Sequence, residues 1–190
     1  LKGLDKALLN DILDDATGYL TEPGELPARS QSLAGRTVAN LFFEASTRTR
    51  ASFDLAGHRL GADVLNLDVN TSSRKKGESI LDTIYTLEAM QVDVMVVRDA
   101  SAGVPAFIAR HALPHVSILN AGESDVSHPT QGLLDVLTIR QCKGGFENLT
   151  VAIVGDIRHS RVAMSATHAL TTLGVGELRL ISPPVLAPDA

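Results

Sequence analysis

The sequence lacks the features that mark secreted, membrane-spanning or nucleic-acid-binding proteins. Its 190 residues include a single cysteine, Cys142, so no internal disulfide framework is available, which fits a reducing cytoplasm. The net charge is −5, from 17 basic and 22 acidic residues, so no overall positive field favours nucleic acid. We find no signal peptide and no apolar run long enough to span a bilayer. These absences favour a globular protein of the cytoplasm.

Both ends of the sequence look cut. The chain opens on LKGLDKALL without an initiator methionine, and it closes on LISPPVLAPDA directly after a predicted strand. Its length suits one domain together with part of another. We therefore expect the sequence to be a piece of a longer protein.

Apolar spacing predicts that helices and strands alternate along the chain. Helices are expected at 6–20, 47–60, 79–90, 104–113, 129–141 and 158–173, and strands at 37–43, 63–68, 92–98, 116–121, 150–156 and 177–181. This alternation predicts an α/β fold in three layers, with a parallel sheet and helices on both of its faces. We predict one such domain at 1–143, a linker at 144–149, and the truncated start of a second domain at 150–190.

Polar stretches follow four of the predicted strands. Three of them are EASTRTR at 44–50, NTSSRKKGES at 70–79 and NAGESDVSHPTQ at 120–131. The fourth is the single residue Arg98, which ends the predicted strand at 92–98. Ligands of open parallel sheets bind outside the carboxyl ends of the strands. The fold therefore predicts that the four stretches share one rim, which would be the place to look for a site.

The stretch EASTRTR has two interpretations. The start of a helix leaves backbone N–H groups without partners, and hydroxyls at Ser46, Thr47 and Thr49 with the Arg48 guanidinium would complete a socket for a phosphate. Alternatively, Ser46 or Thr47 only caps the helix while the arginines face solvent. Arg50 is assigned to packing or to support behind the site. The motif alone leaves both interpretations open.

The loop at 72–78 and His128 also carry two interpretations each, whereas Arg98 indicates a need for a partner. The run SSRKKGE is either a solvated loop or a lid over a charged substrate. Arg98 ends an apolar strand, where a permanent charge is costly unless an anion or an acid meets it. His128 either donates a hydrogen bond to a developing oxyanion, with Gln131 about one turn further on, or caps a helix that opens with proline.

Taken in this order and at these separations, the motifs resemble those of the aspartate/ornithine carbamoyltransferase family. The resemblance covers essentially the whole chain and rests on STRTR, SSRKKGES, VVR, HPTQGLLDVLTI and NLTVAIVGDIRHSRVAMS. It implies transfer of a carbamoyl group from carbamoyl phosphate to the α-amine of L-aspartate, which gives N-carbamoyl-L-aspartate and phosphate in pyrimidine biosynthesis. It implies no metal and no organic cofactor.

The resemblance also implies the residues of the site. The phosphate would be held by Ser46, Thr47, Arg48 and Thr49, with Arg48 stabilising the charge on the leaving group. The carbamoyl oxygen would be contacted by Thr49, Arg98 and His128, and the carbamoyl nitrogen by Gln131. Ser72 and Lys76 would reach the phosphate and aspartate of a neighbouring subunit, and Arg161 would bind an aspartate carboxylate.

The family resemblance bears on assembly and leaves some alternatives open. Sites shared between subunits imply a homotrimer, and some relatives also bind a regulatory chain or a dihydroorotase-like protein. Ornithine is the rival acceptor, but the sequence KKGE at 75–78 and Arg161 favour an acidic one. The family's catalytic chain continues beyond residue 190, so we expect the 190-residue chain alone to be inactive or nearly so. A carbamoyl-phosphate-binding fragment or assembly subunit without turnover is the remaining alternative.

Overall fold

The structure is a computed structural model that describes residues 1–67 and 79–188. The chain forms two compact units. We name them the sheet unit, Thr21–Glu123, and the terminal unit, which combines Leu1–Leu20 with Ser124–Ala190. The domains predicted from the sequence, with boundaries at 143/144 and 149/150, are consecutive segments of the chain and not compact units of this sort, and they stay a prediction.

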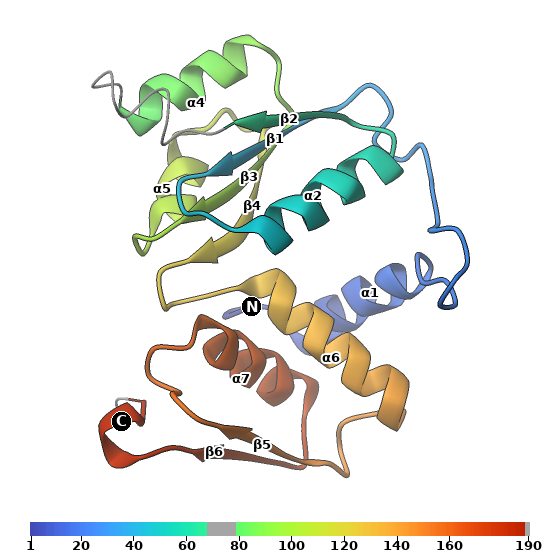
Figure 1. The fold of residues 1–190 in the computed structure, drawn as a ribbon, viewed down its shortest axis with the longest axis vertical. Coiled ribbons are helices and arrows are strands. Elements are labelled where there is room, and N and C mark those ends of the chain that lie inside the picture. Colours follow the sequence, from blue (N-terminus) through green and yellow to red (C-terminus); the bar gives the residue numbers. More distant parts are fainter. Residues whose placement is uncertain (68–78, 189–190) are drawn as a thin grey trace. The chain divides into compact units, whose positions relative to one another are not determined.

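The sheet unit is a four-stranded parallel sheet with helices on both faces (Figure 1). Its elements in chain order are β1 (Thr37–Phe42), α2 (Thr47–Arg59), β2 (Asp63–Leu67), α4 (Ile80–Ala89), β3 (Val94–Asp99), α5 (Val104–His111) and β4 (Ser117–Glu123). The strands lie in the order β2-β1-β3-β4, and every adjacent pair is parallel. The predicted α/β fold with a parallel sheet is confirmed, and each predicted strand and helix is present within a few residues of its expected bounds.

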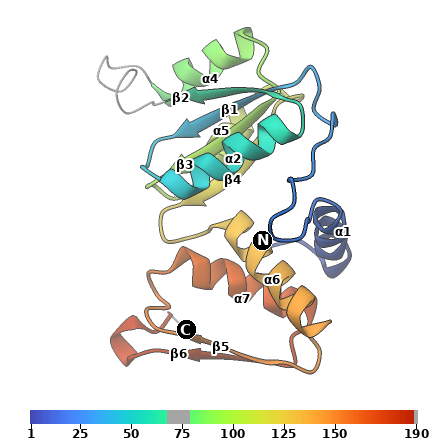
Figure 2. The same cartoon turned by 45° about the vertical axis from the view of Figure 1, so that its right-hand side comes forward.

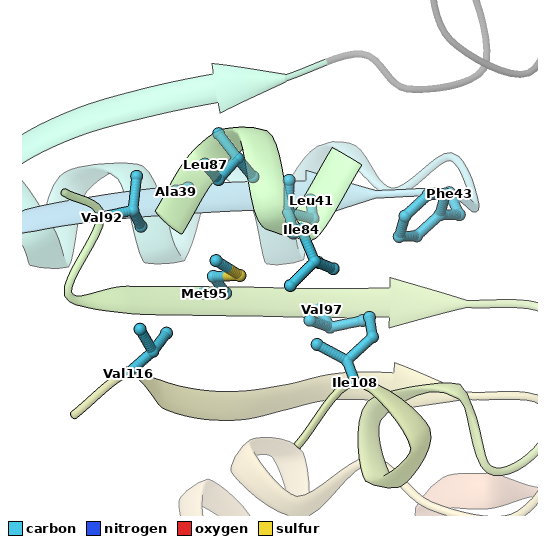
Figure 3. Packing of buried hydrophobic residues seen from close by; sticks show 10 residues of the cluster. All are labelled: Ala39, Leu41, Phe43, Ile84, Leu87, Val92, Met95, Val97, Ile108 and Val116. Carbon is cyan, nitrogen blue, oxygen red and sulfur yellow. The ribbon is translucent and has the colours of Figure 1, made fainter. Parts of the chain in front are cut away.

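The strands divide their side chains between two apolar layers. Because side chains alternate along a strand, Leu41 and Val97 point to the face that α4 and α5 cover, where Ile84 and Ile108 meet them (Figure 3). The opposite face carries a second buried cluster made by Val38, Phe42, Ala62, Val96 and Ala121, against which Phe53 of α2 packs. Figures 1 and 2 both show α2 across this second face. The sheet is thus covered on both sides, as a parallel sheet requires.

Helix α2 lies close to the sheet at one glycine. Gly57 is the helix residue that is buried, and a Cβ built on it would lie 2.7 Å from the Val64 Cγ2 atom of β2. A larger residue would push the helix away from the strand. The short connection that follows β1 places the first turn of α2 beside the carboxyl edge of the sheet, and the close approach at Gly57 holds the other end of the helix against β2.

The terminal unit packs three helices with a second parallel strand pair. Its elements are α1 (Lys6–Thr17), α6 (Pro129–Lys143), β5 (Thr150–Val154), α7 (Arg161–Leu173), β6 (Glu177–Ile181) and the short 3-10 helix η2 (Pro184–Leu186). Its core joins Leu9 and Leu13 of α1 with Val136 of α6, Phe146, and Ala169, Leu170 and Leu173 of α7. Asp5 caps α1 as its position predicts, because its carboxylate accepts from the Leu8 N–H at 2.8 Å. The β5–α7–β6 sequence is the second α/β unit that the pattern predicts. Within the described residues, no helix is long and apolar enough to cross a membrane.

Candidate functional site

The first turn of α2 has the form of an anion-binding helix start. Ser46 occupies the position before the helix with an extended backbone (φ −157°, ψ 104°), yet its side chain makes no capping hydrogen bond. The helical hydrogen bonding starts with the Arg50 N–H, which donates to the Ser46 carbonyl at 3.2 Å. The amides ahead of Arg50 lie at the positive end of the helix dipole, where an anion is favoured. The interpretation of Ser46 as a simple cap is therefore not supported.

The hydroxyls and guanidinium of this turn are accessible. Thr47 and Arg48 are exposed, and Ser46, Thr49 and Arg50 are half-buried. A phosphate at this turn could accept hydrogen bonds from backbone amides and short hydroxyls, and the planar fork of Arg48 suits its oxygens. These are the groups that the sequence predicts for the socket.

Arg98 lies at the end of β3 and is buried, with 5% of its surface exposed. It is the register partner of Phe42 at the end of β1, and its carbonyl accepts from the Phe43 N–H at 2.8 Å. Its Nη1 donates to the Ala121 carbonyl at 3.2 Å, and its Nε lies 3.3 Å from the Glu44 Oε2 atom. The prediction that an acid or anion meets Arg98 is thus fulfilled in part by Glu44. The guanidinium is held in place before any ligand arrives, which lowers the cost of organising it around a substrate.

A cavity of about 510 Å³ adjoins this helix start. It is lined by Phe42, Glu44, Ala45, Ser46, Thr47, Arg50, Ala51, Asp54 and Asn66. Its volume falls in the range of small-molecule sites. Two of the predicted phosphate-binding residues, Ser46 and Thr47, line this cavity, together with Arg50, whose predicted place was behind the site.

His128 and Gln131 belong to the terminal unit and lie at the start of α6. The His128 ring makes no capping hydrogen bond, and its backbone N–H donates to the Ser165 Oγ atom of α7 at 2.8 Å. The Gln131 Nε2 donates to the Asp135 carboxylate at 2.9 Å, so its amide is oriented with Oε1 on the other side. The helix-cap interpretation of the imidazole is therefore not supported, whereas the oxyanion interpretation stays a prediction.

Arg161 is also in the terminal unit, at the first position of α7. The preceding Ser160 caps the helix by accepting from the Ala163 N–H at 3.1 Å. The Arg161 Nη1 donates to the Ser124 carbonyl at 2.9 Å, and the side chain is half-buried. A guanidinium at a helix start suits a carboxylate, since the helix dipole and the formal charge act in the same direction.

Two predicted site residues, Ser72 and Lys76, lie outside the described residues, as does nearly all of the 70–79 stretch. Near Arg161, the backbone N–H of His159 donates to the Asp156 carboxylate at 3.1 Å and lowers the pKa of Asp156 below its ordinary value. Across residues 1–67 and 79–188, no three His, Cys, Asp or Glu side chains are grouped so that they could hold a metal ion.

The structure adds three residues to those predicted from the sequence. Glu44 lies within the quoted motif EASTRTR, but only the fold reveals that it pairs with Arg98. Asn66 and Asp54 line the cavity and are hydrogen-bonded to each other at 2.6 Å. Their pairing depends on how α2 lies on β2, for which the sequence carries no local signal.

Comparison with known proteins gives a consistent result. The family model for the aspartate/ornithine carbamoyltransferase carbamoyl-P binding domain matches residues 1–141. Among solved structures, the chain is similar to aspartate transcarbamoylase from Trypanosoma cruzi in complex with N-(phosphonacetyl)-L-aspartic acid, with 35% identity, a TM-score of 0.83, and coverage of 96% of this chain and 58% of that one. It is similar to the catalytic subunit of M. jannaschii aspartate transcarbamoylase, with 34% identity, a TM-score of 0.85, and coverage of 100% and 61%.

An ornithine enzyme is also among the similar structures. Ornithine carbamoyltransferase from Thermus thermophilus shares 30% identity with a TM-score of 0.86, over 98% of this chain and 61% of that one. The chain therefore spans about three fifths of the length of the solved structures that it matches.

Proposed function

Because the chain belongs to the aspartate/ornithine carbamoyltransferase family, we propose that the protein transfers the carbamoyl group of carbamoyl phosphate to the α-amine of L-aspartate. The single observation that carries the proposal is that the sheet unit contains both a helix start at 46–49 without a side-chain cap and the buried guanidinium of Arg98. The first feature suits a phosphate, and the second suits the oxygen of a carbonyl. Carbamoyl phosphate contains both groups in one small molecule.

The chemistry requires donors around one oxygen atom. When the amine attacks, a C–N bond forms and the carbonyl oxygen gains negative charge; the bond from carbon to the phosphate oxygen then breaks. The amine loses a proton, which the leaving phosphate can accept. Donors aimed at that oxygen bind it more tightly in the transition state than in the ground state, which is the requirement for catalysis. We assign this role to Thr49, Arg98 and His128.

The phosphate end of the donor is assigned to α2. Ser46, Thr47 and Thr49 offer hydroxyls, and Arg48 is exposed at the same turn and can neutralise the charge that grows as phosphate leaves. Ser72 and Lys76 are assigned to the same end of the substrate, from a neighbouring subunit. No covalent intermediate is needed in this scheme, so Cys142 has no part in it.

The remaining polar groups are assigned to substrate orientation. Asp135 holds the Gln131 amide so that its Oε1 can accept from the carbamoyl N–H₂ group. Arg161 would bind a carboxylate of the acceptor, and Lys76 would approach the same molecule. An acidic acceptor fits this set of cations better than ornithine, whose side chain ends in an ammonium group.

A second candidate is ornithine carbamoyl transfer. It is favoured by the similarity to the Thermus thermophilus enzyme, whose TM-score of 0.86 is as high as those of the aspartate enzymes. Both enzymes use the same donor, so a donor site alone does not separate them. The acceptor is what must be tested.

The assembly and pathway are part of the same proposal. A homotrimer with sites shared between subunits is expected, together with a place in pyrimidine biosynthesis in the cytoplasm. A regulatory chain and a dihydroorotase-like protein are two further candidate partners. Size measurement of the purified full-length protein tests the trimer.

The decisive experiment measures phosphate release by the full-length protein from carbamoyl phosphate, with L-aspartate or L-ornithine as acceptor. Aspartate-dependent release with stoichiometric N-carbamoyl-L-aspartate would support the proposal. Release with ornithine alone would establish the second candidate. Calorimetric binding of carbamoyl phosphate without turnover on either acceptor would favour a binding or assembly role.

A further inference from the structure

A chain of polar side chains connects the sheet to α2 behind the anion-binding turn. Asn40 of β1 is fully buried between the apolar residues Val38 and Phe42. Its register partner on β2 is Asn66, and the Asn40 Nδ2 donates to the Asn66 Oδ1 at 3.0 Å. The Asn66 Nδ2 in turn donates to the Asp54 Oδ1 of α2 at 2.6 Å. Three elements are thus joined by two side-chain hydrogen bonds.

The two hydrogen bonds of this polar network run in a fixed direction. An ionised carboxylate only accepts hydrogen bonds, so Asp54 requires the Nδ2 of Asn66. The Oδ1 of Asn66 is then left as an acceptor, and Asn40 must turn its own Nδ2 toward it. The carboxylate of α2 therefore sets both amide orientations, and the bond to Asp54 is the short, charge-assisted one.

The hydrophobic effect does not explain why an amide side chain occupies this buried position. Among the described residues, the Asn40 Oδ1 has no hydrogen-bond partner, although it is buried. Burying an amide with one unsatisfied acceptor destabilises a core compared with an aliphatic side chain of similar size. A role in orientation accounts for its presence better than a role in core packing.

The side of α2 that is hydrogen-bonded to Asn66 is also the side that lines the cavity. Thr47, Arg50, Asp54 and Gly57 are spaced by three or four residues, so they lie along one side of α2. Gly57 fixes the far end of this side by its close approach to Val64. Asp54 is one turn nearer the anion-binding end, and Thr47 and Arg50 line the cavity together with Asp54 and Asn66. A bond at Asp54 thus limits rotation of the helix about its own axis.

We propose that Asn66, supported by Asn40 and bonded to Asp54, is a positioning residue that sets the rotation of α2 and with it the aim of the amides at residues 47–49. The proposal rests on the proposed function, because it assigns those amides to the phosphate of carbamoyl phosphate. Asn66 touches no substrate in this scheme. Its effect on binding passes through the helix.

The test compares two variants of the full-length protein that both keep the net charge. Asn66→Leu removes both hydrogen bonds at a position that is exposed on an edge strand. It also leaves the Nδ2 of the buried Asn40 without its acceptor, which destabilises the fold, so thermal unfolding is measured for each variant beside binding. The double variant Asn66→Asp with Asp54→Asn exchanges the two groups. In it, the new carboxylate accepts from Asn40 and from the new amide, so the chain is complete again with its second bond reversed. Asn148→Leu, an exposed asparagine in the terminal unit, is the matched control.

The readouts are the Kd for carbamoyl phosphate from calorimetry, kcat at saturating substrates, and hydrogen exchange of the hydrogen-bonded α2 amides at 50–57 in the ligand-free protein. Asn66→Leu should raise the Kd roughly tenfold, the effect of one charge-assisted hydrogen bond at a partly exposed position. It should also speed exchange at 50–57, because α2 loses its tether to β2, while kcat changes by less than about threefold, because bound ligand holds the first turn. The double variant should restore both the Kd and the exchange, and Asn148→Leu should change neither.

Three outcomes decide the inference. A Kd for Asn66→Leu within about twofold of wild type, with normal exchange at 50–57, overturns it. Equal defects in Asn66→Leu and the double variant also overturn it, since a merely structural requirement for asparagine would give that result. If wild type fails to bind carbamoyl phosphate, the proposed function fails, and exchange at 50–57 alone still decides whether Asn66 positions the helix.

Discussion

Arg98 offers the sharpest test of the proposed chemistry, through the substitution Arg98→Lys. Lysine keeps the positive charge, but its single ammonium cannot replace both the Nη1 bond to the Ala121 carbonyl and the Nε contact with Glu44 while it also meets a substrate. Losing a donor to the transition-state oxygen costs about 2.7–4 kcal/mol, so kcat should fall about 100- to 1,000-fold.

The cost to folding is a separate quantity and appears in another measurement. Leaving the Ala121 carbonyl without its donor removes about 1–3 kcal/mol of stability. The ion pair with Glu44 contributes about 1 kcal/mol or less, because the Glu44 side chain is 30% exposed and solvent screens the pair. A domain stable by about 5–15 kcal/mol stays folded after these losses.

The assay measures aspartate-dependent phosphate release at saturating substrates, the Kd for carbamoyl phosphate, and thermal unfolding. Arg110→Lys is the matched control, because Arg110 is exposed near the end of α5. A kcat for Arg98→Lys within about fivefold of wild type would refute the oxyanion role. A defect confined to the Kd would refute it as well, since it would place the contribution in the ground state.

The proposed function and the structure lead to three further predictions. Arg48→Ala should reduce kcat by far more than it weakens carbamoyl phosphate binding, and equal losses in steady-state kinetics and calorimetry would contradict a leaving-group role. Mixing full-length Arg48→Ala and Lys76→Ala subunits should restore part of the activity if sites are shared; hybrids without any recovery would show that each chain serves its own site. The Thr37 N–H and the Arg36 guanidinium lower the pKa of Asp93. The stability that Asp93 contributes is therefore full above its unfolded pKa of about 3.9 and is lost as pH falls through its lower folded pKa. Denaturation should show Asp93→Asn to be less stable than wild type at pH 7, with a gap that closes below about pH 4, and a gap independent of pH would contradict this cause.

The order of elements could be read from the sequence because it follows from local periodicity. TVANLF is a short, mostly apolar run whose length favours a buried strand, and its place in a parallel sheet follows from the alternation of strands with helices. The start of α2 at Thr47 was also local, since hydroxyls and a following apolar pattern mark a helix start. Helix ends were less certain: the first helix ends at Thr17, three residues before the predicted bound.

The candidate site also has one part that the sequence predicts and another part that only the fold reveals. The phosphate socket proposed at 46–49 could be predicted from the sequence because its amides, hydroxyls and guanidinium come from one turn. Arg98 was recognisable as a charge that needs a partner, but its bonds to Glu44 and the Ala121 carbonyl join three separate segments. The Asn40–Asn66–Asp54 chain depends on the β1–β2 register and on how closely α2 approaches β2 at Gly57. Sequence patterns record what each residue prefers from its neighbours along the chain, whereas these contacts depend on side chains that only packing brings within hydrogen-bonding distance.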